Sequence, residues 1–208
     1  MTQSSQLRLV IAGIFLAGLA ASAHAADPRY PDWPCAQAKV PDISLAAVWA
    51  GPPLDDVADV WKGKPEIAAL VARLSARRTP LDKAEKQVVS FLSADPANKS
   101  ENGKLLFAGV FETLNAQRSS VMTGIERITR KQRAAAERIR ADTVKLHGMQ
   151  DATTSDPAKL EELANQLTWQ TRIFEDRNKI IQFVCEVPTA IDQRLFALGR
   201  IIQQSIDE

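Results

Sequence analysis

The sequence predicts an all-α protein, in which a long antiparallel helical hairpin lies within a helical bundle and follows an irregular arm rich in proline and tryptophan. Seven of the eleven prolines and three of the four tryptophans fall within residues 27–65. From Gly103 to His147, by contrast, no proline occurs and apolar residues recur in steps of three and four. A basic segment precedes a turn-forming stretch at 148–156, and an acidic segment begins within that stretch and continues after it. Together these observations indicate two long helices that fold back on each other.

The composition is that of one globular domain with a substantial core. The 208 residues include 26 Lys and Arg, 25 Asp and Glu, and 45% hydrophobic residues, which is too apolar for a disordered chain. Proteins that bind nucleic acids usually carry a strongly basic face, whereas here the charges balance. We therefore expect no nucleic acid among the partners.

Residues 1–25 are typical of a secretory signal peptide. Arg8 is the one charge before an apolar run from Leu9 to about Ala21, and Ala23-His24-Ala25 has the small-x-small pattern of a cleavage site. The apolar run is shorter than the roughly 20 residues that a membrane-spanning helix needs. We expect cleavage after Ala25, a periplasmic or secreted protein, and no stable membrane insertion. An uncleaved membrane anchor is the alternative.

The two cysteines, Cys35 and Cys185, predict one disulfide. They lie near the two ends of the expected mature chain, and neither belongs to a Cys-x-x-Cys pair. A pair of distant cysteines in an exported protein most simply forms a single bridge. Two free thiols are the alternative. In the chain-entropy account, closing so long a loop stabilises a fold by up to roughly 5 kcal/mol.

Residues 26–64 are predicted to form the arm. Proline at this density prevents a continuous helix and is unsuited to a central strand. One short helical turn is expected from Ser44 to Trp49. The side chains of Trp33, Trp49 and Trp61 are large and apolar, so we expect the helical body to cover them, with the disulfide holding the arm in place.

Residues 65–208 are predicted to form the helical body. Pro65 opens a helix, in the first-turn position that proline tolerates, and a second helix follows Thr79-Pro80. Turn-forming residues then predict a loop over 95–103.

The hairpin helices are predicted at 104–147 and 157–186. Their apolar residues follow a spacing close to that of a coiled coil. A turn of this length returns the chain alongside itself. The dipeptide Val187-Pro188 interrupts the second helix, and a last helix begins at Thr189.

Charge is expected to set the pairing of the two hairpin helices. Residues 126–145 carry seven basic and three acidic side chains, while residues 151–176 carry six acidic and two basic ones. Folding about the turn places Gln132 near Phe174. The ion pairs expected from this register, each worth a few tenths of a kcal/mol, join Arg130 to Glu175 and Asp176, and Arg140 to Glu161 and Glu162.

Five residues are candidates for binding a partner. Tyr30 and Trp33 are aromatic residues in a segment stiffened by proline, which lose little entropy on binding. Arg130, Arg133 and Arg138 belong to the basic run of the first hairpin helix. Structural roles are the alternatives: the arm packs on its own bundle, and the basic run pairs with the acidic helix or faces solvent.

No constellation of residues predicts catalysis or a cofactor. The spacings Gly-x-Ser-x-Gly, His-Glu-x-x-His and the phosphate-binding loop are absent from the sequence. His147 lies at a predicted helix end, without a facing ligand for haem or a metal cluster around it. The stretch from Asn98 to Gly103 lacks the carboxylates of a calcium loop. We predict no catalytic, cofactor or metal residues, and no enzyme.

The sequence therefore predicts a non-catalytic accessory or adaptor protein of the cell envelope, exported to the periplasm, which binds another protein through helical surface. A homo-oligomer is compatible with this prediction. One alternative is a helical bundle that binds a metal or small ligand. A second alternative is a hydrolase that acts on cell-wall polymer.

Overall fold

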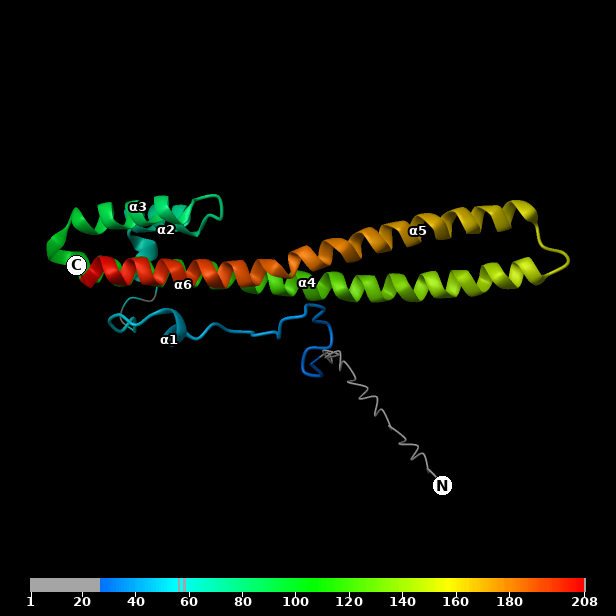
Figure 1. Ribbon diagram of the computed structural model, residues 1–208, viewed down its shortest axis with the longest axis horizontal. Helices are drawn as coiled ribbons and strands as arrows, with labels where there is room; N and C mark the ends of the chain where they lie inside the picture. Colours follow the sequence, from blue (N-terminus) through cyan, green and yellow to red (C-terminus); the bar gives the residue numbers. More distant parts are fainter. Residues whose placement is uncertain (1–26, 56, 58, 208) are drawn as a thin grey trace, which may run out of the picture.

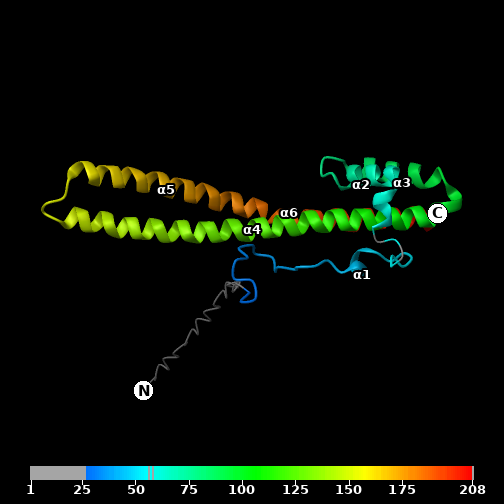
Figure 2. The same cartoon turned by 180° about the vertical axis from the view of Figure 1, so that it is seen from behind.

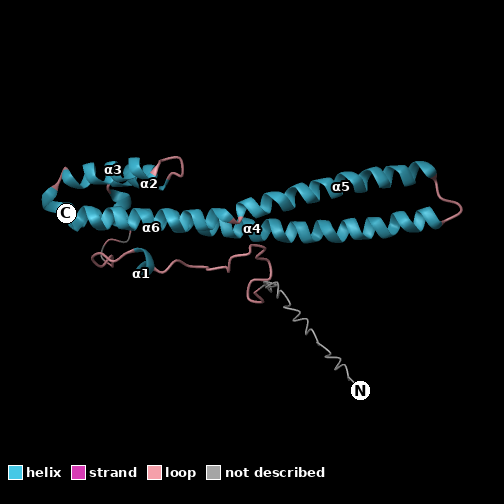
Figure 3. Ribbon diagram, viewed as in Figure 1, coloured by secondary structure: helices cyan, strands magenta, loops and turns pink. Residues whose placement is uncertain are grey.

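A computed structural model describes residues 27–55, 57 and 59–207. The expected signal peptide, residues 1–25, lies outside the described residues. In the described part of the chain every regular element is a helix, and no strand occurs (Figure 3). The prediction of an all-α protein is confirmed.

One helix, α4, runs the whole length of the molecule. It spans Lys99–Asp151, 53 residues, which corresponds to about 80 Å at 1.5 Å per residue. After the turn, α5 and α6 follow one another back along it, so the predicted antiparallel hairpin is confirmed (Figure 1). The remaining helices are shorter; the elements are α1 (Leu45–Val48), a 3-10 turn (Val60–Gly63), α2 (Pro65–Ser75), α3 (Leu81–Ser93), a 3-10 turn (Pro96–Asn98), α4, α5 (Pro157–Val184) and α6 (Glu186–Asp207).

The main core lies at the end of the molecule far from the turn. There α2 and α3 cover α4 and α6 (Figures 1 and 2). Apolar side chains from these helices are completely inaccessible, among them Leu74, Phe107 and Leu198. Each such side chain contributes about 1.5–3 kcal/mol through burial. Arg194 of α6 also donates two hydrogen bonds, of 2.8 and 2.5 Å, to the carbonyl of Leu74, and so ties α6 to the end of α2.

Glycine allows two segments to approach the long helices closely. A Cβ atom at Gly109 of α4 would lie 2.6 Å from Val71 of α2. A Cβ atom at Gly199 of α6 would overlap the backbone carbonyl oxygen of Val48 in α1. The missing side chains therefore permit contacts that any other residue would separate.

The predicted loop over 95–103 is wrong in its second half. Only Asp95 and the 3-10 turn Pro96–Asn98 precede α4, which begins at Lys99. Gly103 lies inside the helix and is buried, and a Cβ atom there would overlap the side chain of Ile206 in α6. The glycine serves packing between helices and does not mark a turn. At its other end, α4 continues past the predicted boundary at His147 to Asp151.

The break between α5 and α6 lies at Cys185, before the predicted interruption at Val187-Pro188. Proline has no N–H group and its ring collides with the carbonyl four residues earlier. For Pro188 that carbonyl belongs to Val184, the last residue of α5. The proline itself is tolerated in the first turn of α6, so the last helix starts at Glu186 and not at Thr189.

The predicted register of the hairpin is confirmed. Gln132 of α4 donates hydrogen bonds to the carbonyl of Phe174, at 3.0 Å, and to Oδ1 of Asn178, at 2.9 Å. The amide of Gln132 is buried and satisfied there, which fixes the level at which α4 and α5 meet. On the same seam α5 buries Leu163 and Leu167.

The predicted ion pairs across the hairpin are wrong. Within the residues that the structure describes, no ion pair joins α4 to α5. Arg130 pairs with Asp32 of the arm at 2.9 Å, and Arg140 pairs with Glu137 of its own helix at 2.5 Å. The seam is filled by uncharged side chains, and Arg130 and Arg140 form their ion pairs away from α5.

We predict opposite effects of alanine at two glycines. Gly199→Ala should lower the free energy of unfolding by about 1–3 kcal/mol, because the new methyl group has no space against Val48. Gly124→Ala is the matched control in α4, where no atom lies within 4 Å of the added Cβ atom. It should raise stability by about 0.5–1 kcal/mol, because alanine favours a helix more than glycine does. Urea unfolding measures both, and a stabilising Gly199→Ala would contradict this packing.

Candidate interaction surface

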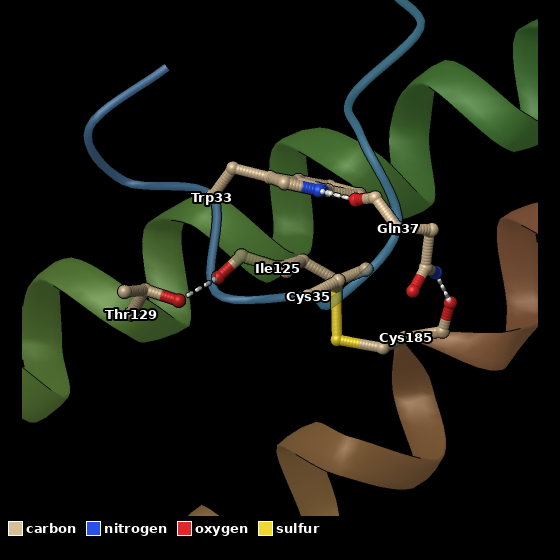
Figure 4. Close-up of a disulfide and its surroundings, with 6 residues drawn as sticks. All are labelled: Trp33, Cys35, Gln37, Ile125, Thr129 and Cys185. Carbon is tan, nitrogen blue, oxygen red and sulfur yellow. Dashed lines mark hydrogen bonds between the residues drawn. A yellow bond between two sulfur atoms is a disulfide. The ribbon is translucent and has the colours of Figure 1, made fainter. Parts of the chain in front are cut away.

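The arm is bonded covalently to the junction of α5 and α6. Cys35 and Cys185 form the predicted disulfide, with their Cα atoms 5.5 Å apart (Figure 4). Trp33 lies beside the bridge, 8% exposed, against Met122 and Ile125 of α4. Its Nε1 donates a 2.7 Å hydrogen bond to the carbonyl of Gln37. The Gln37 side chain in turn donates to the carbonyl of Cys185, so the arm also contacts the helix break through hydrogen bonds.

Ion pairs hold the arm on both sides of this bridge. Asp32 accepts from Arg130 at 2.9 Å and from Arg133 at 2.6 Å. Lys39 lies 2.6 Å from Glu126, with both side chains mostly covered. The Lys39 ammonium group also lies 4.7 Å from the ring centre of Tyr30, a cation–π contact. These contacts run along one side of α4.

Further along the arm, the other two tryptophans also pack on the body. Trp49 is buried and stacks on Phe107 of α4, with ring centres 4.2 Å apart. Trp61 donates a 3.0 Å hydrogen bond from Nε1 to Glu112 of α4. The helical body thus covers the arm's tryptophans, as their size suggested.

Four of the five candidate partner-binding residues have contacts within the chain. Tyr30 and Trp33 pack beside the disulfide, while Arg130 and Arg133 bind Asp32. The fifth, Arg138, is exposed and lies on a different part of α4. It lines a hollow between α4 and α5.

Two adjoining hollows form a groove between α4 and α5, which we call the hairpin groove. The first has a volume of about 250 Å³ and is lined by Ala135, Arg138, Ile173 and Arg177 together with seam residues. The second, of about 160 Å³, is almost entirely apolar. Its lining residues are Ile125, Ile128, Arg177, Ile180, Ile181 and Val184.

Exposed apolar side chains form a row on α5, which we call the α5 stripe, and two of them, Ile173 and Ile180, line the hairpin groove. The stripe consists of Trp169, Ile173, Ile180 and Phe183, which are 65%, 45%, 59% and 72% exposed. Their spacing of four, seven and three residues places them along one side of the helix. In the described part of the chain nothing covers this side of α5.

The α5 stripe does not follow from a coiled-coil spacing, because that spacing gives α5 a single apolar seam. Phe174, Ile181 and Val184 form that seam, and each follows an apolar residue of the stripe by one position. The sequence therefore contains a second series of apolar residues in this segment, spaced four, seven and three residues apart. A helix with two apolar series has an apolar arc wider than one neighbouring helix can cover.

The described residues contain no group of three or more His, Cys, Asp or Glu side chains placed to hold a metal ion. No helix among them has the length and apolar character needed to cross a membrane.

In comparisons with known proteins, no family model, no curated protein and no solved structure matches the chain.

An ion pair between α4 and α6 also contacts the arm, and its arginine is buried while its aspartate is partly exposed. Arg118 of α4, with a side chain 4% exposed, lies 2.7 Å from Asp192 of α6. Its Nη1 donates a 3.1 Å hydrogen bond to the carbonyl of Pro41 in the arm. Burial raises the pKa of Asp192 above its ordinary value of 3.8, and the positive charge of Arg118 opposes this shift.

We predict that Asp192 makes stability depend on pH in a defined direction. Because its pKa is raised in the folded state, the contribution of Asp192 to stability is present below 3.8 and is lost as the pH rises through the raised value. Asp192→Asn cannot titrate. The urea midpoint of the wild type should therefore fall, relative to that of Asp192→Asn, as the pH rises from about 3 to about 6. A relative rise would mean that Arg118 outweighs burial.

Removal of the disulfide should destabilise the protein strongly. The bridge joins residues 150 positions apart, and loss of so long a cross-link typically lowers the free energy of unfolding by about 2–4 kcal/mol. We expect this decrease in the double variant Cys35→Ser, Cys185→Ser, measured by urea unfolding. The wild type in reductant is the control and should match the variant. Equal midpoints for the oxidised wild type and the variant would show that the bridge adds no stability.

Proposed function

We propose that this protein is a non-catalytic adaptor of the cell envelope, exported to the periplasm, which binds another protein through the exposed side of its helical hairpin. The observation that carries the proposal is the α5 stripe. Four large apolar side chains lie in a row on a helix, largely open to solvent. Single exposed apolar residues are ordinary, whereas contiguous ones commonly mark a site of interaction.

The site of the stripe in the fold also supports the proposal. The α4–α5 pair extends beyond the main core, and α5 packs chiefly against α4 and α6 (Figure 1). Two helices alone bury only the seam between them. The protein therefore presents this pair to its surroundings with one apolar side uncovered, as a binding platform requires.

Export is supported by the chemistry of the arm. The Cys35–Cys185 bridge fits an oxidising compartment, where disulfides form and persist. The signal-like segment at residues 1–25 supports the same compartment from the sequence.

A photocrosslinking experiment tests the proposal in cells that make the protein. Trp169 is replaced by benzoylphenylalanine, and the matched control carries the same residue at Glu175, which is exposed on α5 but does not belong to the α5 stripe. We expect a discrete adduct with another protein from position 169 and not from position 175, because only the first lies on the stripe. Adducts in equal yield from both positions, or from neither, would contradict an adaptor that uses this surface.

A further inference from the structure

We infer that the hairpin groove receives an amphipathic α-helix of the partner protein, with an apolar side facing the groove and acidic residues along its flanks. This inference rests on the proposed function and states the chemistry of the partner.

The length of the groove fits a short helix. Its lining residues on α4 extend from Ile125 to Ile139, which is about 21 Å at 1.5 Å per residue. A helix of about four turns spans that distance. The two exposed isoleucines that line the groove from α5, Ile173 and Ile180, lie two turns apart. Such a spacing suits the packing of ridges of one helix into the groove between two others.

The backbone of the groove favours a helix over an extended peptide. Both walls are continuous α-helices, α4 and α5, whose backbone N–H and C=O groups bond within each helix. An extended peptide gains its affinity mainly from hydrogen bonds to free backbone groups, and the walls offer none between the helix ends. Elsewhere in the molecule, the helices α2 and α3 cover the pair α4–α6. A further helix would cover the α4–α5 pair in the same way.

The charges of the groove favour acidic flanks on that helix. Arg138 and Arg177 line the groove, and no carboxylate does. Among the described residues neither arginine forms an ion pair. Lys131 lies one turn from both Ile128 and Ala135, on the same side of α4. One carboxylate, Asp176, lies on the same side of α5 as the stripe, three residues after Ile173. It forms an ion pair of 3.4 Å with Lys179. Three basic side chains are therefore available to acidic residues of the partner.

A second copy of this chain fits the groove less well. Its own exposed apolar row is the α5 stripe, which is flanked by Arg172, Arg177 and Lys179 and by one carboxylate, Asp176, which is already paired with Lys179. A copy that inserted this stripe would bring these cations toward Arg138 and Arg177 of the first copy, and like charges at an interface are unfavourable.

Binding of two designed peptides to the full mature protein tests the inference. The first is an 18-residue helical peptide with leucines on one side and glutamates on the flanks. The second keeps the leucines and replaces every glutamate with lysine. Fluorescence anisotropy of the labelled peptides should show binding of the acidic peptide at least about tenfold tighter than that of the basic one. Its affinity should fall as salt is raised, because the rim contacts are electrostatic.

Three variants of the protein locate the binding site. Ile180→Asp should weaken the acidic peptide by about tenfold or more, because it places a carboxylate in the apolar part of the groove. Arg138→Glu should weaken it severalfold. Arg140→Glu is the matched control, since Arg140 is exposed on the same helix, pairs with Glu137 and does not line the groove; it should leave the affinity unchanged. All three residues are wholly or partly exposed, so the variants should fold.

Several outcomes would overturn the inference. Equal binding of the two peptides would remove the role of charge, and equal effects of Arg138→Glu and Arg140→Glu would place the peptide elsewhere. Dimerisation in analytical ultracentrifugation that Ile180→Asp abolishes would make a second copy the occupant. Binding to anionic lipid vesicles that Ile180→Asp abolishes would make a membrane the ligand. If the peptides fail but position 169 still captures a protein in the crosslinking experiment, the inference fails while the proposed function stands.

Discussion

The length of α4 is the constraint on which the rest of the structure depends. A single helix of 53 residues cannot bury its own apolar side, and an isolated helix gains little stability without packing. Each stretch of α4 therefore requires cover from another part of the chain. At one end α2, α3 and α6 supply it, near the middle the arm does, and toward the turn α5 does. Different parts of the chain therefore cover successive stretches of α4.

The middle of α4 is where the cover changes, and the arm's most specific contacts gather there. Pro188 prevents α5 and α6 from forming one straight helix, so the returning chain bends beside Ile125 and Met122. Trp33 fills the space at the bend, and the disulfide fastens it to Cys185. Asp32 pairs with Arg130 and Arg133, so that Arg130 does not reach the acidic residues of α5 with which its register predicted a pair. An irregular segment thus completes a core that helices alone leave open.

How far the sequence determines this arrangement differs from feature to feature. Spacing along a helix predicted the level at which Gln132 meets Phe174, because both positions follow from counting residues about the turn. It failed for Arg130, whose partner Asp32 lies 98 residues away in a segment without periodicity. Gly103 predicted a turn, because glycine is common in turns. The reason for glycine at this position is the close contact with Ile206, which lies far along the chain and cannot be inferred from the local sequence. The hairpin groove could not be predicted from the spacing, because its apolar residues on α4 and α5 lie next to those of the seam between the two helices and follow similar steps.

The uneven cover of α4 has a consequence for motion. Near its N-terminus α4 is covered by α2, α3 and α6. Between the disulfide and the turn its one neighbouring helix among those described is α5, of which Leu163 and Leu167 are buried. Regions with few buried apolar contacts open at lower free energy than the global transition. We therefore expect the α4–α5 hairpin near the turn to open locally at lower free energy than the core formed by α2, α3, α4 and α6. A ligand that docked along the hairpin would oppose this local opening, because it would bind the closed pair of helices in preference to the open one.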